Sequence, residues 1–411
     1  MRNWGGNYAY RAGRLHRPAM LDELRRIVAA APRVRVLGTR HAFSDIADSA
    51  ELVTLDALPA DVAVDRDAGT VSFGAGITFG GLATALTRER IGLRNLPSTP
   101  HISVGGAIAT ATHGSGDANG NLATAVAELE LVTSTGEVVT TRRGDPDFEG
   151  LVVGLGATGA VTRVTLDAES AYEVSQRVFE GLAWDALSEQ FDAVFASGDS
   201  VSLFTRWGDA IEQAWVKRRV TSAPERAAAD FFGARPAASE RNPVPGMEPA
   251  NSTGQLGRPG LWSDRLPHFR MGFTPSAGEE IQSEYHVPRR HALAAIEALR
   301  DLADTIRPLL YICEIRTVAA DRLWMSPQYG RDSVALHFTW RRDQQAVERV
   351  LESVEAALAP FAARPHWGKL FLADAARTGG LYERLGDFMS LLDRVDPRGA
   401  FRNPWLERHV G

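Results

Sequence analysis

The pattern of apolar and polar positions along the chain predicts an alternation of helices and strands. Over residues 18–31, apolar side chains recur with the 3.6-residue period of an amphipathic helix, and Pro18 suits its first turn. The same period predicts helices near 81–90, 290–306 and 344–359. Short apolar runs between turn residues predict strands at 34–37, 70–73, 126–132, 137–141, 161–166, 308–318 and 333–340.

The strand predicted over 333–340 has two faces of different chemistry. Every second side chain from Val334 to Trp340 is apolar, which marks the face that turns toward a core. The opposite face carries His337 and Thr339, an imidazole and a hydroxyl. A strand that lines a pocket presents polar groups in this way.

The strand predicted over 308–318 carries charge in an apolar setting. Apolar residues lie on both of its faces, which indicates that both faces are buried. Glu314 and Arg316 share one face, and burying them is costly unless the charges are paired or serve a function. From the residues alone, a salt bridge that fixes the sheet and a functional pair are equally compatible with the sequence.

Three glycine-rich turns occur within the first 160 residues, at 38–41, 98–121 and 154–159. Glycine lets the backbone approach a ligand closely, and successive backbone N–H groups can hold an extended anionic one. His41 follows the first of these turns, at the end of a predicted strand. This context raises His41 above a lone structural histidine as a candidate site residue.

Two kinds of cofactor site are not expected. Residues 74–80 follow a strand and precede a helix, but their glycines lack the G-x-G-x-x-G spacing of a nicotinamide site. With one cysteine, Cys313, the chain can form neither an intrachain disulfide nor a cysteine-based metal site. The ten histidines show no ligand spacing such as H-x-x-x-H, so the sequence predicts no metal.

Composition narrows the class of protein. A length of 411 residues suggests about two domains. The net charge of −6 and the lack of a basic cluster argue against nucleic acid as a partner. Neither a secretory signal nor an apolar run long enough for a membrane span is recognisable, so we expect a cytoplasmic protein.

Only two of the 45 basic residues are lysines, Lys217 and Lys369. An amine and a guanidinium are not interchangeable in a site, so each of these two lysines calls for an explanation.

Several long motifs resemble one family. They are 36–43 (VLGTRHAF), 98–106, 110–114, 156–161 and 396–403. In these segments the chain is similar to flavoproteins of the vanillyl-alcohol oxidase type, most of all to alditol oxidases, with aldonolactone oxidases as more distant relatives. The resemblance covers nearly the whole chain. It implies an α+β fold of two domains: an FAD-binding domain of residues 1–168, completed by 370–411, and a substrate or cap domain of residues 169–369 with an antiparallel sheet.

The resemblance also implies the cofactor and the residues around it. FAD would be bonded covalently to His41, and backbone near Val161 would face its adenine end. The cofactor-binding residues implied are His41, Val36, Leu37, Gly38, Thr39, Arg40, Ala42, Ser98, Ser103, Gly106, Thr110, Ala111, Thr112, His113, Val161, His366 and Asn403.

On the substrate side, the resemblance favours a functional role for Glu314 and Arg316 over a purely structural salt bridge. The residues expected to hold a polyol are Ser98, Glu314, Arg316, Thr339 and Lys369. The residues expected to take part in catalysis are Lys369, Arg316, Glu314 and His337. Pro97 precedes Ser98 at a position that borders the oxygen-reactive edge of the flavin in this superfamily.

The reaction implied is oxidation of the terminal primary hydroxyl of an alditol, of the xylitol or sorbitol type, to the aldose. Oxygen would be reduced to hydrogen peroxide. The expected partners are thus a small polyol and O2, without nucleic acid or membrane, and a monomer is compatible with this. Two alternatives stay open: an aldonolactone oxidase or dehydrogenase, and a flavin-binding protein without turnover.

Overall fold

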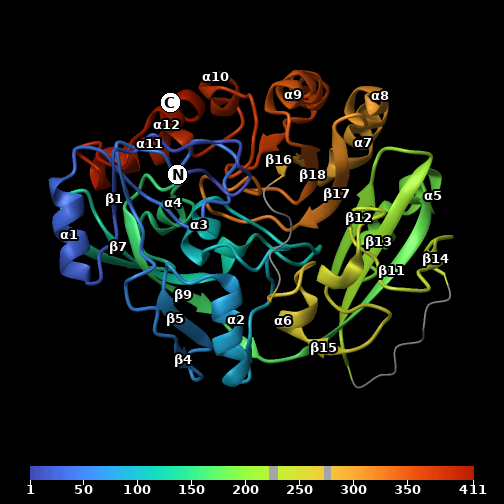
Figure 1. Cartoon of the computed structure of the whole chain (residues 1–411), viewed down its shortest axis with the longest axis horizontal. Helices are drawn as coiled ribbons and strands as arrows, with labels where there is room; N and C mark the ends of the chain where they lie inside the picture. Colours follow the sequence, from blue (N-terminus) through green and yellow to red (C-terminus); the bar gives the residue numbers. More distant parts are fainter. Residues whose placement is uncertain (222–229, 273–278) are drawn as a thin grey trace.

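The structure, a computed structural model, describes residues 1–221, 230–272 and 279–411. The described residues form four sheets together with helices, so the expected α+β class is observed (Figure 1). Strands that precede residue 168 form two of these sheets, and strands from residue 173 onward form the largest one. The small fourth sheet pairs β6 (Ile91–Gly92) with β10 (Glu169–Ser170).

The first sheet is parallel and carries the predicted helix at its side. Its order is β1 (Arg14–His16), β3 (Glu51–Val53), β2 (Val34–Val36). Helix α1 (Leu21–Ala30) buries Leu24 and Val28 in a core that it shares with Val34 of β2. The helix predicted at 18–31 is confirmed over Leu21–Ala30, so Pro18 precedes the first turn and does not lie in it, and the strand predicted at 34–37 is confirmed.

The second sheet is antiparallel and has the order β4, β5, β9, β7, β8. Its strands are β4 (Ala63–Asp65), β5 (Thr70–Gly74), β7 (Val126–Val132), β8 (Val138–Arg142) and β9 (Ala160–Asp167). Helix α2 (Phe79–Arg88) begins earlier than predicted because the Thr78 hydroxyl caps it, accepting from the Gly81 N–H. Two short helices complete this half: α3 (Val104–Ala109) and α4 (Phe148–Val152).

The largest sheet has nine antiparallel strands in the order β14, β11, β13, β12, β17, β18, β16, β19, with β15 paired to β11. We call it the cap sheet. Its strands are β11 (Glu173–Ala183), β12 (Ser200–Thr205), β13 (Ala210–Arg219), β14 (Arg235–Pro236), β15 (Gly260–Leu261), β16 (Glu280–Pro288), β17 (Leu310–Val318), β18 (Ser333–Arg341) and β19 (Arg364–Pro365).

Helices cover one face of the cap sheet. They are α5 (Trp184–Phe195), α7 (Ala292–Arg300), α8 (Ala303–Ile306) and α9 (Gln344–Leu358), with the short α6 (Trp262–Arg265) elsewhere. The apolar face predicted for 333–340 is fully buried in the core with the inner residues of these helices. The other face of β18, with His337 and Thr339, is thereby left toward the first half of the chain.

The C-terminal segment returns to the first half (Figure 1). Its helices are α10 (Ala375–Gly379), α11 (Leu385–Val395) and α12 (Pro404–His409). Asn403 fixes this return: its oxygen accepts from Arg35 Nη2 at 2.8 Å and from the Leu406 N–H. Its amide donates to the backbone oxygens of Ile46 and Asp48. The domain limits predicted at 168 and 370 stay a prediction.

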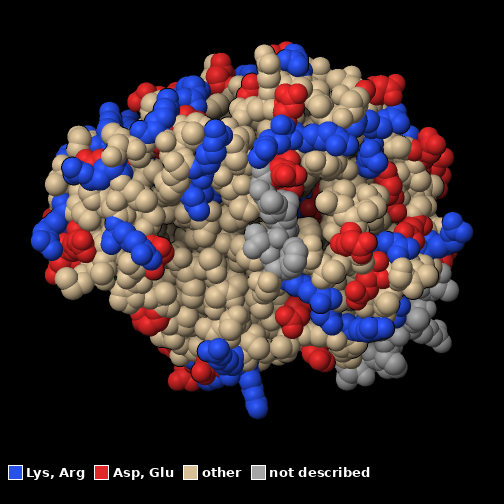
Figure 2. Space-filling model, in the orientation of Figure 1, with Lys and Arg blue, Asp and Glu red and all other residues tan. Residues whose placement is uncertain are grey.

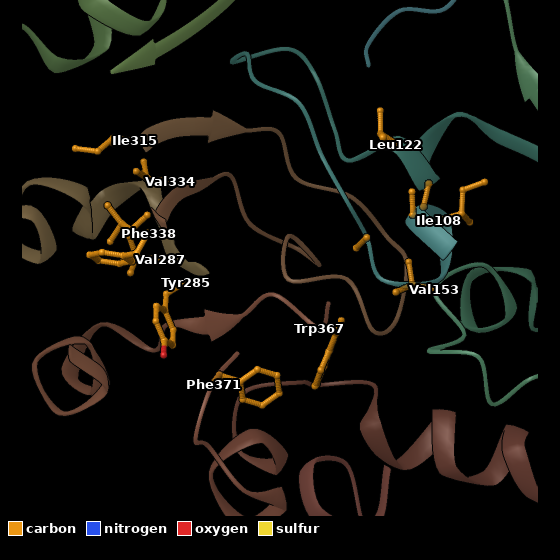
Figure 3. Close-up of a cluster of buried hydrophobic side chains, with 14 of the residues drawn as sticks. Ile108, Leu122, Val153, Tyr285, Val287, Ile315, Val334, Phe338, Trp367 and Phe371 are labelled. Carbon is orange, nitrogen blue, oxygen red and sulfur yellow. The ribbon is translucent and has the colours of Figure 1, made fainter. Parts of the chain in front are cut away.

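One apolar core runs through both halves. Figure 3 shows Ile108 and Val153 from the first half, Phe338 of the cap sheet, and Trp367 from the C-terminal part, all of them members of this core. A shared core fixes the cap sheet relative to the glycine-rich segments, and hence fixes the shape of any cavity between them.

The surface has mixed charge on the face seen in Figure 2, where basic and acidic side chains alternate around the rim. Among the described residues, no helix has the length and apolar character needed to cross a membrane.

Candidate active site

A cavity of about 670 Å³ lies between the cap sheet and the glycine-rich segments. This volume is within the range of sites for small molecules and cofactors. The first half contributes residues around 35–47 and 97–113, and the cap sheet contributes side chains of β16, β17 and β18. The cavity therefore brings together segments that are far apart in the sequence.

Most of the predicted site residues line this cavity. They are Val36, Leu37, Gly38, Thr39, Arg40, His41, Ala42, Ser98, Ser103, Gly106, Thr110, Thr112, His113, Glu314, Arg316, His337, Thr339, His366 and Lys369. Three others do not line it. Ala111 turns the chain behind α3 with a φ of 53°, and Val161 lies on β9. Asn403 stands behind Arg35, which itself lines the cavity.

The first two glycine-rich segments interlock at one wall of the cavity. The Ser103 N–H donates to Thr39 Oγ1 at 3.0 Å. A Cβ on Gly38 would collide with the Ser103 hydroxyl, so this position requires glycine. Arg40 has a φ of 65°, a left-handed conformation that a non-glycine residue adopts only when its surroundings impose it. This backbone is shaped for close approach of an extended ligand.

His41 meets the requirements for attachment to a cofactor. Its Nδ1 lies 3.1 Å from Thr39 Oγ1, and Trp4 stacks on its ring at 5.2 Å. Its Nε2 is buried and has no hydrogen-bond partner among the described residues. Burial and the nearby Lys369 lower the pKa of His41 to about 4, so the imidazole is neutral and keeps a nucleophilic lone pair.

Opposite this wall, Arg316 is held between two carboxylates. Its Nη2 lies 2.7 Å from Glu284 Oε1, and its Nε lies 3.6 Å from Glu314 Oε1. Its Nη1 faces Ser98 Oγ at 3.4 Å, which ties the cap sheet to the second glycine-rich segment. Burial alone would lower the pKa of Arg316, but the two carboxylates outweigh it and raise that pKa.

The two carboxylates stay ionised despite their burial. Burial raises the pKa of Glu314, but Arg316 and His268 outweigh it and hold that pKa far below its ordinary value. Burial likewise raises the pKa of Glu284, but His113 and Arg316 outweigh it and hold that pKa well below its ordinary value. Glu314 and Arg316 thus form a buried ion pair and also line the cavity. A salt bridge that fixes the sheet and a functional pair, the two alternatives from the sequence, are therefore compatible with each other.

Register explains why these side chains meet. On the cap sheet, His337 of β18 stands directly between Glu314 of β17 and Glu284 of β16. One pair further along, Thr339 stands between Ile312 and Gln282. Burial lowers the pKa of His337 to about 3, so its ring is neutral.

Lys369 completes the polar wall from the C-terminal side. Its ammonium donates to Gln282 Oε1 and lies 5.3 Å from the centre of the Phe43 ring. Burial lowers the pKa of Lys369, and the Glu284 carboxylate opposes that shift. Lys369 and Arg316 therefore bring two cationic groups to one cavity that also contains His41.

Sequence reasoning missed Glu284 and Gln282. Both line the cavity from β16, where polar residues at 280, 282, 284 and 286 alternate with Ile281, Ser283, Tyr285 and Val287. This period of two is the signal that could have identified them. His268, which reaches Glu314 from outside β17, and Lys217, which contacts His268, were also missed as site residues.

One group of potential metal ligands occurs among the described residues: His113, Glu284 and His286. His113 Nε2 lies 2.9 Å from Glu284 Oε1. The guanidinium of Arg316 already binds this same oxygen, so a cation there would meet an existing positive charge. We therefore infer that the Glu284 carboxylate pairs with Arg316 and His113 and not with a metal ion.

Comparisons with known proteins identify the family of the chain. A family model described as an FAD binding domain matches residues 14–142, and one described as D-arabinono-1,4-lactone oxidase matches residues 277–409. The chain is 47% identical to alditol oxidase of a Streptomyces species over 98% of this chain and 97% of that protein. It is 28% identical to L-gulono-1,4-lactone dehydrogenase of Mycobacterium tuberculosis over 100% and 98% of the two chains.

Among solved structures, cholesterol oxidase from B. sterolicum has the same fold. It superposes with a TM-score of 0.79 at 15% identity, covering 100% of this chain and 96% of that chain. The fold and the family predicted from the sequence motifs are thus confirmed. The chain belongs to the alditol oxidase family of flavoproteins, with an FAD-binding domain and a fold of the vanillyl-alcohol oxidase type.

Proposed function

We propose that the protein is an FAD-dependent oxidase that converts the terminal primary hydroxyl of an alditol to an aldehyde. Xylitol and sorbitol represent this substrate class, and O2 is reduced to hydrogen peroxide. The observation that carries the proposal is the polar wall of Glu314, Arg316 and Lys369, which faces the glycine-rich segments across one cavity. A protein that only bound a flavin would have no need of this buried set of charges.

The residues present fit FAD. The loop at 36–42 and the segments around Ser103 and Thr110 would hold it, and His41 would bond it covalently. When bound, the flavin supplies the acceptor for the hydride that leaves the substrate carbon. The neutral ring of His41 and its buried, unpartnered Nε2 support the covalent link.

The chain's own residues would hold the polyol by pairing its hydroxyls. Ser98 and Thr339 offer hydroxyl groups from opposite sides of the cavity, and Glu314 offers a carboxylate acceptor. A site that pairs many hydroxyls discriminates strongly against analogues without them, because its buried polar groups are then left unsatisfied. Selectivity for polyols over simple alcohols follows from this arrangement.

Positive charge is the main contribution to the chemical step. Arg316 and Lys369 would stabilise the negative charge that develops on the substrate oxygen as its proton leaves. Glu284 and Glu314 hold the Arg316 guanidinium from two sides, so it needs little reorganisation during the reaction. His337 is neutral and stands next to Glu314, where it would be a secondary contact.

A second candidate function is oxidation of an aldonolactone. The match of residues 277–409 to a family model described as D-arabinono-1,4-lactone oxidase favours it. The greater identity to alditol oxidase than to the lactone dehydrogenase favours the alditol. In either case the same cavity and the same cationic groups would serve.

Anaerobic bleaching of the flavin tests the proposal. Xylitol and sorbitol should bleach the absorbance near 450 nm of the purified holoenzyme, and L-gulono-1,4-lactone should do so much more slowly. Bleaching by the lactone alone would replace the alditol with the second candidate. No bleaching by any of these compounds would leave a flavin-binding protein without turnover.

A further inference from the structure

Lys217 is buried and fully occupied as a donor. It lies on β13 with an exposed fraction of 1%. Its ammonium donates to the backbone oxygens of Leu266 and Pro267, and its third hydrogen faces His268 Nδ1 at 3.3 Å. An ammonium has three hydrogens and no acceptor, so these three partners match the protonated form.

His268 connects this lysine to the active site. Its Nε2 lies 2.7 Å from Glu314 Oε1, and the ring lines the main cavity. Because Nδ1 receives a hydrogen from Lys217, the neutral ring must carry its own proton on Nε2 and donate it to Glu314. Lys217 thus selects the tautomer of His268, as a second partner does for histidines in many sites.

The surroundings hold the His268 ring in place. Phe204 and Trp215 meet it edge to face, with ring centres 5.5 and 5.3 Å away. Burial and the charge of Lys217 lower the pKa of His268 to about 4, so the ring is neutral. Glu314 and Arg316 are the other charged groups that act on this histidine.

We propose that Lys217 and His268 are positioning residues that fix the Glu314 carboxylate for binding of the substrate hydroxyls. The proposal rests on the proposed function, because it assigns Glu314 the role of acceptor for the polyol. The chain of contacts runs from Lys217 through His268 Nδ1 and Nε2 to Glu314 Oε1. Arg316 Nε faces the same oxygen, Glu314 Oε1, at 3.6 Å.

The geometry makes substrate binding depend on the protonation of Lys217. Burial lowers the pKa of Lys217 to about 7, while Glu314 opposes the shift and Arg316 and Arg265 add to it. Lys217 also lines a second cavity of about 180 Å³ that reaches the exposed residues Arg94 and Asp199, together with Arg219.

The number of hydrogens on the Lys217 nitrogen determines whether the KM rises or falls with pH. Below its pKa, Lys217 has three hydrogens for three acceptors. Above it, the neutral amine has two, and the longest contact, to His268 Nδ1, is the one it loses. The tautomer that donates to Glu314 is then no longer fixed, so the KM for the polyol should rise as pH increases through about 7.

The experiment uses the holoenzyme and measures kcat and KM for xylitol from about pH 6 to about pH 9. We expect the wild-type KM to rise about ten- to hundredfold over this range, with a smaller change in kcat, as for loss of a hydrogen bond to a charged group. Lys217→Met should have the high KM at every pH. His268→Gln, which keeps an amide donor for Glu314, should have a KM that no longer depends on pH in this way.

Gln176→Met is the matched control. Gln176 faces Lys217 across β11 and β13 and donates to the backbone of Thr253 and Gly254. The Thr253 hydroxyl donates to the Pro267 oxygen, so Gln176 supports the stretch that Lys217 binds but has no titratable group. This variant should keep the wild-type pH profile. A control that shifts KM as Lys217→Met does would reduce the role of Lys217 to holding the segment.

The outcomes separate the two proposals. If the wild type oxidises no polyol, the proposed function fails and the relay has no substrate to position. If the wild type turns over xylitol with a KM that is flat across pH 7, the relay is wrong while the function stands. The dependence of the wild-type KM on pH therefore tests the relay even if Lys217→Met does not fold.

Discussion

Lys369→Ala should slow anaerobic reduction of the flavin by xylitol about 10²–10³-fold, as expected when one preorganised electrostatic group is removed from an active site. The reason is the position of the ammonium, which lines the cavity with His41 and Arg316 and is desolvated there. A charge in such a site is worth more than the same charge in water. Stopped-flow absorbance at saturating xylitol measures the rate directly.

The control for Lys369→Ala removes a positive charge from the same sheet but outside the cavity. Arg341, at the end of β18, is exposed and is not among the cavity residues, so Arg341→Ala should reduce its flavin at the wild-type rate. A near-normal reduction rate in Lys369→Ala would remove this lysine from the chemical step. The remaining Arg316 would then have to provide the stabilisation alone.

His41→Ala should convert a covalent flavin into one that dissociates on denaturation. In the wild type, acid precipitation should leave the yellow colour with the protein pellet. In His41→Ala the colour should appear entirely in the supernatant, because this variant lacks the neutral imidazole that we propose forms the bond. Absorbance of pellet and supernatant at 450 nm measures the division.

His101→Ala is the matched control for that variant. His101 lies in the second glycine-rich segment, acts electrostatically on His41, and is not among the cavity residues. Its flavin should stay with the pellet. Release of all flavin from the wild type would contradict the covalent link and leave the rest of the active site unaffected.

The sequence predicted those parts of the site that follow a regular period. Alternation separated His337 and Thr339 from the core side of β18, and the structure has both lining the cavity. The same reasoning identified Glu314 and Arg316 on one face of β17. A strand has only two faces, so a correct element almost fixes where each of its side chains lies.

The parts that the sequence did not predict depend on pairing between distant segments. Glu284 reaches Arg316 because β16 and β17 flank β18, an order that local patterns do not encode. His268 lies in an irregular stretch without a period, and only the folded chain brings it against Lys217, 51 residues earlier. The rarity of lysine marked Lys217 for attention but gave no partner for it.

The cofactor loops show a different limit. Glycine spacing located the interlocked wall at Gly38 and Ser103, because the close approach there excludes a Cβ. The family resemblance did not separate residues that line the cavity from residues that support it: it grouped Ala111, Val161 and Asn403 with the cofactor residues, and these three do not line the cavity. Their assignment to FAD stays a prediction.

The most direct test of the central claim is oxygen uptake by the purified holoenzyme with xylitol, in parallel with catalase-sensitive detection of peroxide. We expect rapid uptake with one peroxide formed per aldehyde, which also requires that Pro97, at the cavity wall, leaves oxygen access to the flavin. Bleaching of the flavin by xylitol without oxygen uptake would contradict an oxidase and make the protein a dehydrogenase with another acceptor.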